Sequence, residues 1–224
     1  MARAKNESDI IESFIRYNLS YSDGIIIWER GSTDNTKEII QKLVAEGLPI
    51  YLEDEPAIVA APFINGEDDI RDIMAQVAIN EHDADIILPL DADEFLYHVD
   101  GSSPCETLEC LPEHIEHQVQ WRTYLYEKEP DRSMGFLPNN FNKYRNPKME
   151  NETVSGTTIV SRWLIDNKQV HINPGAHDLS WMHHQEREME ISTSLVCAHF
   201  PIRSRMQALQ KRRSTLDLCL ACSC

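Results

Sequence analysis

Apolar positions in the first hundred residues follow two different spacings. Short runs of β-branched and aliphatic residues at 25–28, 49–52 and 86–90 are typical of buried strands. Between them, apolar residues recur every three or four positions, which predicts helices that cover a sheet. These helical segments span residues 10–19, 39–47 and 67–80. Strands that alternate with helices of this length predict βαβ units, so we expect an α/β fold with a Rossmann-like, mostly parallel sheet flanked by helices.

The second half of the chain has a different pattern. Residues 119–126 and 157–165 predict two further strands, separated by the polar segment 127–152. A loop of that length within a compact domain is usually functional or mobile. Residues 203–213 combine basic side chains with helical spacing and predict a helix. A chain of 224 residues can bury one sizeable core, so we expect a single domain.

Composition and charge limit the classes of partner. Hydrophobic residues at 42% and charged residues at 26% are typical of a globular protein. A formal charge of −16 argues against a nucleic-acid partner, because phosphate backbones are bound by clustered Lys and Arg. No apolar run approaches the roughly 18 residues that span a bilayer, and we find no signal peptide. We therefore expect a cytoplasmic protein, in which the basic segment 203–213 could make peripheral membrane contact.

The apolar run 86–90 ends abruptly in the pair Asp91-Ala92-Asp93, with Glu94 directly behind it. Alternate residues of a strand project the same way, so the two carboxylates can share one ion just past the strand end. Mg²⁺ and Mn²⁺ are commonly held by one or two carboxylates together with substrate phosphates. The pair therefore predicts a divalent-metal site that binds a phosphate-containing ligand. The alternative is an acidic turn that only caps the next element.

Two upstream segments also follow predicted strands. Residues 31–34 (Gly-Ser-Thr-Asp) open a helix, so their backbone N–H groups could bind an anion, and Glu29 could accept hydrogen bonds from a base or a ribose. Residues 5–7 (Lys-Asn-Glu) stand between a short possible strand and a helix. Helix capping is the alternative for both segments. Because the carboxyl ends of parallel strands meet at one sheet edge, we expect all three segments to converge.

The order of these motifs is more specific than any one of them. Lys-Asn-Glu at 5–7, Glu-Arg-Gly-Ser-Thr-Asp-Asn-Thr at 29–36 and Leu-Asp-Ala-Asp-Glu-Phe at 90–95 resemble family 2 glycosyltransferases with a GT-A fold. The late segment His-Phe-Pro-Ile-Arg-Ser at 199–204 is similar to the His-x-Pro-x-Arg-Ser segment of one bacterial branch of that family. The likeness covers most of the chain, and one departure is Glu29, where the family usually has Asp.

The resemblance implies an inverting, metal-dependent glycosyltransferase. Such an enzyme moves a sugar from a nucleotide-diphosphate sugar to a hydroxyl of a saccharide or other acceptor, in polysaccharide or glycoconjugate assembly. It implies a nucleotide-sugar half over about 1–97, an acceptor half over about 98–213 and a tail at 214–224. A non-catalytic relative that only binds the nucleotide sugar is the main alternative. A nucleotidyltransferase is disfavoured, because residues 1–8 lack a Gly-rich, basic phosphate loop.

The resemblance also implies roles for single residues, carried over by position. The nucleotide-binding residues implied are Lys5, Glu7, Glu29, Asp34, Asp91 and Arg203, with Arg203 facing the diphosphate. Asp91, Asp93 and His199 are implied to bind Mn²⁺ or Mg²⁺.

The acceptor hydroxyl must lose a proton during an inverting displacement. A carboxylate within hydrogen-bond reach of that hydroxyl can accept it. In related enzymes this base lies in the second half of the chain. We expect Asp178 to be the base, with Glu186 and Glu188 as rivals and His177 lining the pocket. A surface turn residue is the alternative reading of Asp178.

Overall fold

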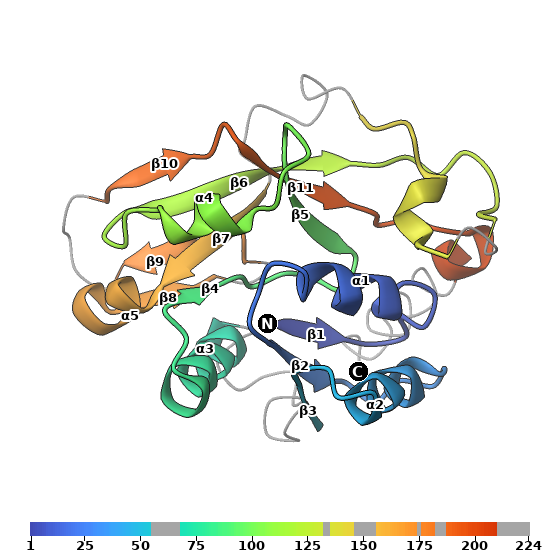
Figure 1. Ribbon diagram of the computed structural model, residues 1–224, viewed down its shortest axis with the longest axis horizontal. Coiled ribbons are helices and arrows are strands. Elements are labelled where there is room, and N and C mark those ends of the chain that lie inside the picture. The colour runs from blue at the N-terminus through green and yellow to red at the C-terminus, as the bar shows by residue number, and fades with distance from the viewer. Residues whose placement is uncertain (55–67, 132–134, 146–155, 174–175, 182–186, 210–224) are drawn as a thin grey trace, which may run out of the picture.

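The computed structural model describes residues 1–54, 68–131, 135–145, 156–173, 176–181 and 187–209. These form an α/β fold in which a small parallel sheet meets a larger mixed sheet (Figure 1). The smaller sheet has the order β1-β2-β3: β1 (Ala2–Ala4), β2 (Ile25–Glu29) and β3 (Ile50–Asp54). The larger has the order β4-β7-β6-β11-β5: β4 (Ile86–Ile87), β7 (Gly156–Ser161), β6 (Glu116–Thr123), β11 (Leu195–His199) and β5 (Glu94–His98). In addition, β10 (Met189–Ile191) pairs with β6.

The two sheets are joined through the first residue of the chain. The nitrogen of Met1 donates to the carbonyl of Leu88 at 2.8 Å, and Leu90 N donates to the carbonyl of Met1 at 3.1 Å. Because these bonds flank Pro89, the missing N–H of that proline costs no bond to Met1. The order of neighbouring strands therefore continues from β3 through β2 and β1 to β4, where the larger sheet begins.

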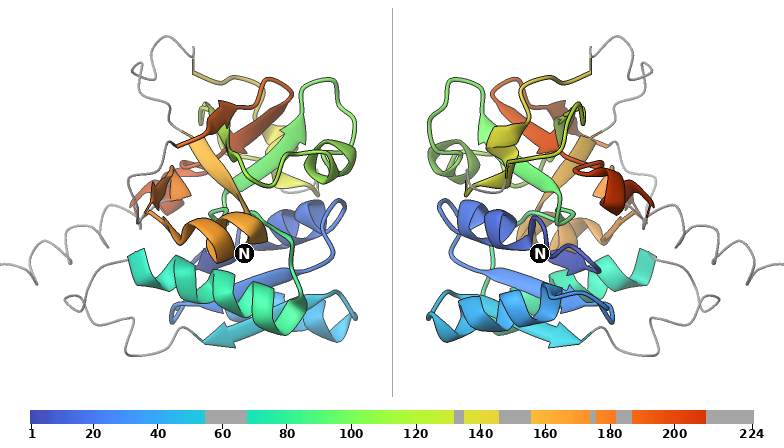
Figure 2. Two further views of the ribbon diagram at one scale, coloured as in Figure 1. Left: turned by 90° about the vertical axis from the view of Figure 1, so that its left-hand side faces the viewer. Right: turned by 90° about the vertical axis from the view of Figure 1, so that its right-hand side faces the viewer.

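The first half confirms the predicted βαβ units. Both pairings in β1-β2-β3 are parallel, and the strands are connected by α1 (Ile11–Asn18) and α2 (Thr36–Ala45). These helices share one core cluster with Ile25 and Ile27 of β2. On the other face, Ile26 and Trp28 pack with α3 (Asp68–His82), so the sheet is covered on both sides (Figures 1 and 2). Burial of β2 on both faces of the sheet explains its continuous apolar sequence.

In the second half the sheet is mixed rather than mostly parallel. The pairs β4–β7, β7–β6 and β11–β5 are antiparallel, whereas β6 is parallel to both β11 and β10. Parallel neighbours need long crossover connections, usually helices, and the regular alternation of strands with long helices stops near residue 98. The described helices beyond that point are short, as in α4 (Cys105–Glu109). The fold is therefore α/β with a mixed sheet.

The predicted strand 157–165 is also shorter than expected. Strand β7 ends at Ser161, and α5 (Arg162–Lys168) begins at the next residue. The side-chain oxygen of Ser161 accepts a hydrogen bond from Leu164 N at 3.1 Å, which caps the helix. Ser161 marks the start of this helix in the sequence, because serine is a preferred N-cap residue. The spacing of apolar residues alone does not reveal it.

The remaining described elements are small. They are the 3₁₀ helix η2 (Leu137–Asn140), the hairpin pair β8 (Val170–Ile172) and β9 (Leu179–Trp181), and a helical turn at residues 205–209. The rest of the predicted helix 203–213 and the tail at 214–224 lie outside the described residues.

Candidate functional site

The loops after β1 and β2 are bound together by backbone-to-side-chain hydrogen bonds. Asn6 N donates to Ser32 Oγ at 2.9 Å, and Glu7 N donates to Thr36 Oγ1 at 2.8 Å. In return, Thr33 N donates to Asn6 Oδ1 at 2.8 Å. Segments 5–7 and 31–34 therefore meet at the carboxyl edge of the small sheet, as expected for segments that follow parallel strands.

Glu29 shapes the turn that follows β2. Its carboxylate is buried and accepts hydrogen bonds from Ser32 N at 2.6 Å and Gly31 N at 3.0 Å. Gly31 has φ +68°, a left-handed conformation that glycine adopts without a Cβ clash. Glu29 thus holds the backbone N–H groups of this turn instead of pointing into open solvent. Lys5, at the end of β1, is exposed.

Asp34 joins the start of α2 to the first loop. Its Oδ1 accepts from Thr36 N at 3.0 Å and its Oδ2 accepts from Ser8 N at 3.2 Å. Partial burial acts to raise the pKa of Asp34, but the hydrogen bonds from Thr36 and Ser8 outweigh it, so the pKa is lowered. The charged carboxylate is therefore part of what holds the two loops together.

Asp93 and His199 are brought together by the pairing of β5 with β11. Glu94 lies opposite His199 in that register, and Phe200 N donates to the carbonyl of Asp93 at 2.9 Å. His199 Nε2 consequently lies 3.8 Å from Asp93 Oδ1. Behind them Glu94 is buried, and burial, reinforced by the charges of Asp91 and Asp93, raises its pKa well above the usual range. Glu94 therefore favours its neutral form.

Arg203 connects the Asp-x-Asp pair with the first loop. Its guanidinium is fully buried and donates to Asp93 Oδ2 at 3.2 Å, to Asp9 at 2.9 and 3.0 Å, and to Glu7. Burial acts to lower the pKa of Arg203, but attraction to Glu7 and Asp9 outweighs it and raises the pKa. One arginine thus holds three carboxylates from two separate loops.

Asp91 points to a partner that the sequence did not indicate. Its side chain is about half exposed, and Oδ1 accepts from Arg71 Nη2 at 2.9 Å. Arg71 lies on α3 and is itself buried. No local motif marked this arginine, because the contact joins two elements twenty positions apart in the chain.

A divalent cation fits part of this arrangement. Within the described ranges, no group of three His, Cys, Asp or Glu side chains is positioned to hold a metal. Asp93 Oδ1 and His199 Nε2 nevertheless face each other, and carboxylate oxygen with imidazole nitrogen is a donor pair that Mn²⁺ accepts. Such ions often take only one or two protein carboxylates and complete their shell with substrate phosphates and water.

Trp121 lies between His199 and His177, the residue that precedes Asp178. Its ring lies 4.6 Å from the His199 ring and 4.8 Å from the His177 ring, measured between centroids. His177 is fixed by a 2.8 Å hydrogen bond between its Nδ1 and the Gly156 carbonyl. Asp178 follows directly, half-buried, with Oδ1 accepting from Asn173 Nδ2 at 2.6 Å. Trp121 is partly buried against the core cluster, and its ring lies between those of the two histidines.

The two rival bases differ in position. Glu186 lies outside the described residues. The carbonyl of Glu188 accepts from Glu116 N at 3.0 Å, which places Glu188 at the start of β6. Trp121 is five residues further along the strand, a rise of roughly 17 Å at 3.3 Å per residue. The structure therefore separates Glu188 from the Trp121–His199 region.

The architecture is that of GT-A glycosyltransferases. Among solved structures, the chain is similar to TarS residues 1–349 from S. aureus in complex with UDP, with 12% identity and a TM-score of 0.51. That match covers 90% of this chain and 60% of TarS 1–349, so the chain spans less than two thirds of that protein.

A second match is partial. Glucosyl-3-phosphoglycerate synthase from Mycobacterium tuberculosis, solved with Mn²⁺, UDP and glucosyl-3-phosphoglycerate, gives 21% identity and a TM-score of 0.35. It covers 54% of this chain and 42% of the synthase. No protein-family model and no curated protein matches the chain.

Proposed function

We propose that this chain is an inverting glycosyltransferase that moves a sugar from a nucleotide-diphosphate sugar to a hydroxyl acceptor. The observation that carries the proposal is the convergence of Asp93, His199 and Arg203 with the loops after β1 and β2. In open α/β sheets, ligands bind in the crevice outside the carboxyl ends of the strands. The GT-A fold supports the same reading by analogy.

In this proposal the nucleoside lies over the loops after β1 and β2. Glu29 and Asp34 set the shape of that surface, because their carboxylates fix the backbone of both loops. Exposed Lys5 offers an ammonium group at the same edge. Arg203 acts through Glu7 and Asp93, as a positioning residue that holds both loops in one arrangement.

The cation site is proposed at Asp93 and His199, with Asp91 turning toward it from Arg71. A bound Mn²⁺ or Mg²⁺ would supply Lewis-acid stabilisation of the departing nucleoside diphosphate. This chain's own residues hold the site in shape: Arg203 fixes one oxygen of Asp93, which leaves the other facing His199.

Asp178 is the proposed base that takes the proton of the acceptor hydroxyl. Its hydrogen bond from Asn173 fixes the carboxylate orientation, and the neighbouring His177 connects it to Trp121. Trp121 offers an apolar ring face on which a sugar could pack. The acceptor is proposed to enter along this side of β6.

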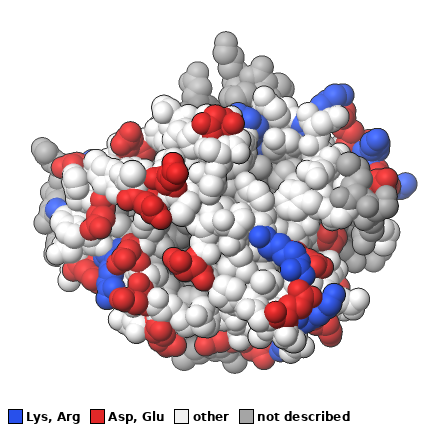
Figure 3. Space-filling view, viewed as in Figure 1, with Lys and Arg blue, Asp and Glu red and all other residues white. Residues whose placement is uncertain are grey.

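The face of the molecule seen in Figure 3 does not favour a nucleic-acid acceptor. Acidic side chains are spread over the visible face in Figure 3, and Lys and Arg do not form one continuous patch there. Across the described part of the chain, no helix combines the length and apolar character needed to cross a membrane.

A thermal-shift panel tests the proposal. UDP-, GDP- and dTDP-sugars are each added with and without Mn²⁺, and the correct donor should raise Tm only with the metal. Asp93→Asn should abolish that metal-dependent rise, whereas Asp166→Asn, an exposed carboxylate on α5, should keep it. No rise with any donor would contradict the proposal.

Turnover separates an enzyme from a protein that only binds the donor. Asp178→Asn should retain the donor-dependent rise in Tm and lose transfer to an acceptor by at least about 100-fold, the usual contribution of general-base catalysis. Donor binding with no transfer or hydrolysis in the parent protein would instead indicate the non-catalytic relative.

A further inference from the structure

Glu116 is a fully buried carboxylate at the start of β6. Arg187 binds it with two hydrogen bonds, from Nε to Oε2 and from Nη2 to Oε1, both at 2.9 Å. Three further donors lie at 3.3 Å, namely the amide of Gln118, the indole N–H of Trp181 and the backbone N–H of Leu179. Because a carboxylate has about four acceptor sites, Glu116 has no site left for a ligand.

Two side chains of β6 bind the backbone on either side of Asp178. Leu179 N donates to Glu116 Oε1 at 3.3 Å. Gln118 lies two residues further along β6 and therefore on the same face, and its Nε2 donates to the carbonyl of His177 at 3.4 Å. The peptide group before Asp178 and the peptide group after it are thus both bound to buried side chains of one strand.

The ring of His177 is held from a second direction. Its Nδ1 donates to the Gly156 carbonyl at 2.8 Å. Gly156 pairs with Gln120 of β6, and a Cβ at this glycine would lie 2.1 Å from the Val119 carbonyl oxygen. Only glycine therefore lets β7 approach β6 this closely. The carbonyl that binds His177 is fixed by the pairing of two strands.

The carboxylate of Asp178 is oriented by the facing strand of its hairpin. Asn173 Nδ2 donates to Asp178 Oδ1 at 2.6 Å, and Asn173 N donates to the Asp178 carbonyl at 3.2 Å. Among the described residues, no donor reaches Oδ2. This is the oxygen that can accept a proton from an acceptor hydroxyl.

Stability alone does not explain an ion pair at this position. Burying a charge is unfavourable, and apolar side chains of similar size can often replace a buried ion pair without loss of stability. Arg187 is also only partly buried, with 37% of its side chain exposed. What the pair supplies is direction, because the guanidinium fork fixes both oxygens of Glu116 and one of these oxygens binds Leu179 N.

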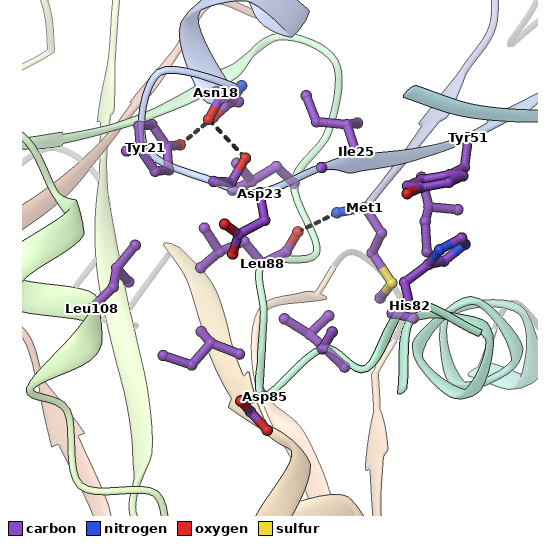
Figure 4. A pocket seen from close by; sticks show the side chains of 18 of the residues that line it. Met1, Asn18, Tyr21, Asp23, Ile25, Tyr51, His82, Asp85, Leu88 and Leu108 are labelled. Carbon is purple, nitrogen blue, oxygen red and sulfur yellow. Dashed lines mark hydrogen bonds between the residues drawn. The ribbon is translucent and has the colours of Figure 1, made fainter. Parts of the chain in front are cut away.

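The Glu116 network, defined as Glu116, Gln118 and Arg187, lies outside the pocket between β2 and β4. That pocket has a volume of about 390 Å³, and Figure 4 shows Ile25 and Leu88 among the residues that line it. No member of the network lines it. The contacts of the network are to its own members, to Trp181 and to the backbone at 177–179. They indicate that the network holds this segment in place.

We propose that Glu116 is a positioning residue for the transfer reaction and holds Asp178 in the direction needed to accept the proton of the acceptor hydroxyl. It acts through Leu179 N, and Gln118 supports it through the carbonyl of His177. This inference rests on the proposed function, because it needs Asp178 to be the base. A displacement of about 1 Å can cost about 100-fold in rate, so the network affects turnover more than donor binding.

Glu116→Gln tests the proposal, because it keeps the size of the side chain and removes the charge that Arg187 binds. We expect kcat of the folded protein to fall at least about tenfold, while KM for the donor changes less than about twofold. Ser161→Ala is the matched control. It removes hydrogen bonds at the other end of β7, so it should lower Tm and keep kcat. Equal kcat values for the two variants would overturn the proposal.

A double variant separates positioning from general damage to the fold. In Asp178→Asn protein, Glu116→Gln should cause no further loss of kcat, because the group that it positions is already gone. A further tenfold loss in that background would overturn the proposal.

Two milder variants keep the test decisive if Glu116→Gln does not fold. Arg187→Lys keeps the charge and loses the guanidinium fork, and Gln118→Leu loses the bond to the His177 carbonyl. Each should lower kcat and leave KM for the donor unchanged. Full kcat in both variants would overturn the positioning role alone. A parent protein that transfers no sugar would instead overturn the proposed function, and this inference with it.

Discussion

Arg203 offers the most direct test of how the candidate site is held together. Arg203→Met removes the guanidinium but keeps a long apolar side chain in its place. Glu7, Asp9 and Asp93 then lose the cation that they share. Removing one partner of a buried ion pair typically costs about 3–5 kcal/mol. For a chain of this size, each kcal/mol lowers Tm by about 2–4 °C, so we expect a decrease of roughly 6–20 °C.

The free energy of unfolding is measured by urea denaturation followed by circular dichroism. Arg16→Met is the matched control: Arg16 pairs with Glu12 and Glu46, but its side chain is 43% exposed, so its loss should cost less than about 1 kcal/mol. If Arg203 stabilises the fold by neutralising these carboxylates, the effect of Glu7→Gln on the free energy of unfolding should change sign when Arg203 is absent. Glu7→Gln should destabilise the parent protein but stabilise the Arg203→Met variant, because it then removes an unpaired charge. A loss below about 1 kcal/mol for Arg203→Met would refute the reasoning.

Three further predictions concern single contacts. Ser161→Ala removes the cap of α5 together with the hydrogen bond that Ser161 Oγ donates to the Glu113 carbonyl, and it should lower the free energy of unfolding by about 1 kcal/mol or more in urea denaturation; an unchanged value would contradict this. The pKa of Asp34 is lowered by folding, so its contribution to stability is present above its unfolded pKa and is lost as pH falls through the folded value; Asp34→Asn should therefore flatten the acid side of a Tm–pH curve, and an unchanged curve would contradict this. His199→Ala should weaken Mn²⁺ binding in calorimetry without lowering secondary structure, and unaltered Mn²⁺ affinity would reject its role as a ligand.

The first half of the fold could be predicted because local pattern and tertiary structure agree there. The strand at 25–28 is a buried apolar run, the strand at 49–52 is buried only at Ile50, and the helix between them has one apolar face. In the second half the strands are paired by contacts distant in sequence, as between β11 and β6. No local pattern contains that information, so the antiparallel pairings and the short helix α5 were missed.

Part of the candidate site could also be predicted from local sequence patterns. The motifs mark where strands end, and the carboxyl ends of parallel strands meet at one edge, so the meeting of the loops after β1 and β2 could be predicted. Asp93 meets His199 through the antiparallel pairing of β5 with β11, which the sequence pattern did not predict. The partners of each carboxylate do not follow from the motifs. The ion pairs of Arg71 with Asp91 and of Asp9 with Arg203 depend on helix packing and side-chain direction. A single sequence does not reveal either of these.

The ion pairs of Arg203 also have a consequence for the order of folding. The arginine stands 196 positions after Glu7 and 194 after Asp9, so nearly the whole chain must be synthesised before the cluster can form. Until then, an emerging N-terminal half carries three carboxylates without their cation. Contacts of such long sequence separation form late, because their loop-closure entropy is lost before they gain anything in return. The loops that carry Glu7, Asp9 and Asp93 should therefore reach their final arrangement only in the last step of folding, after Arg203 has been synthesised.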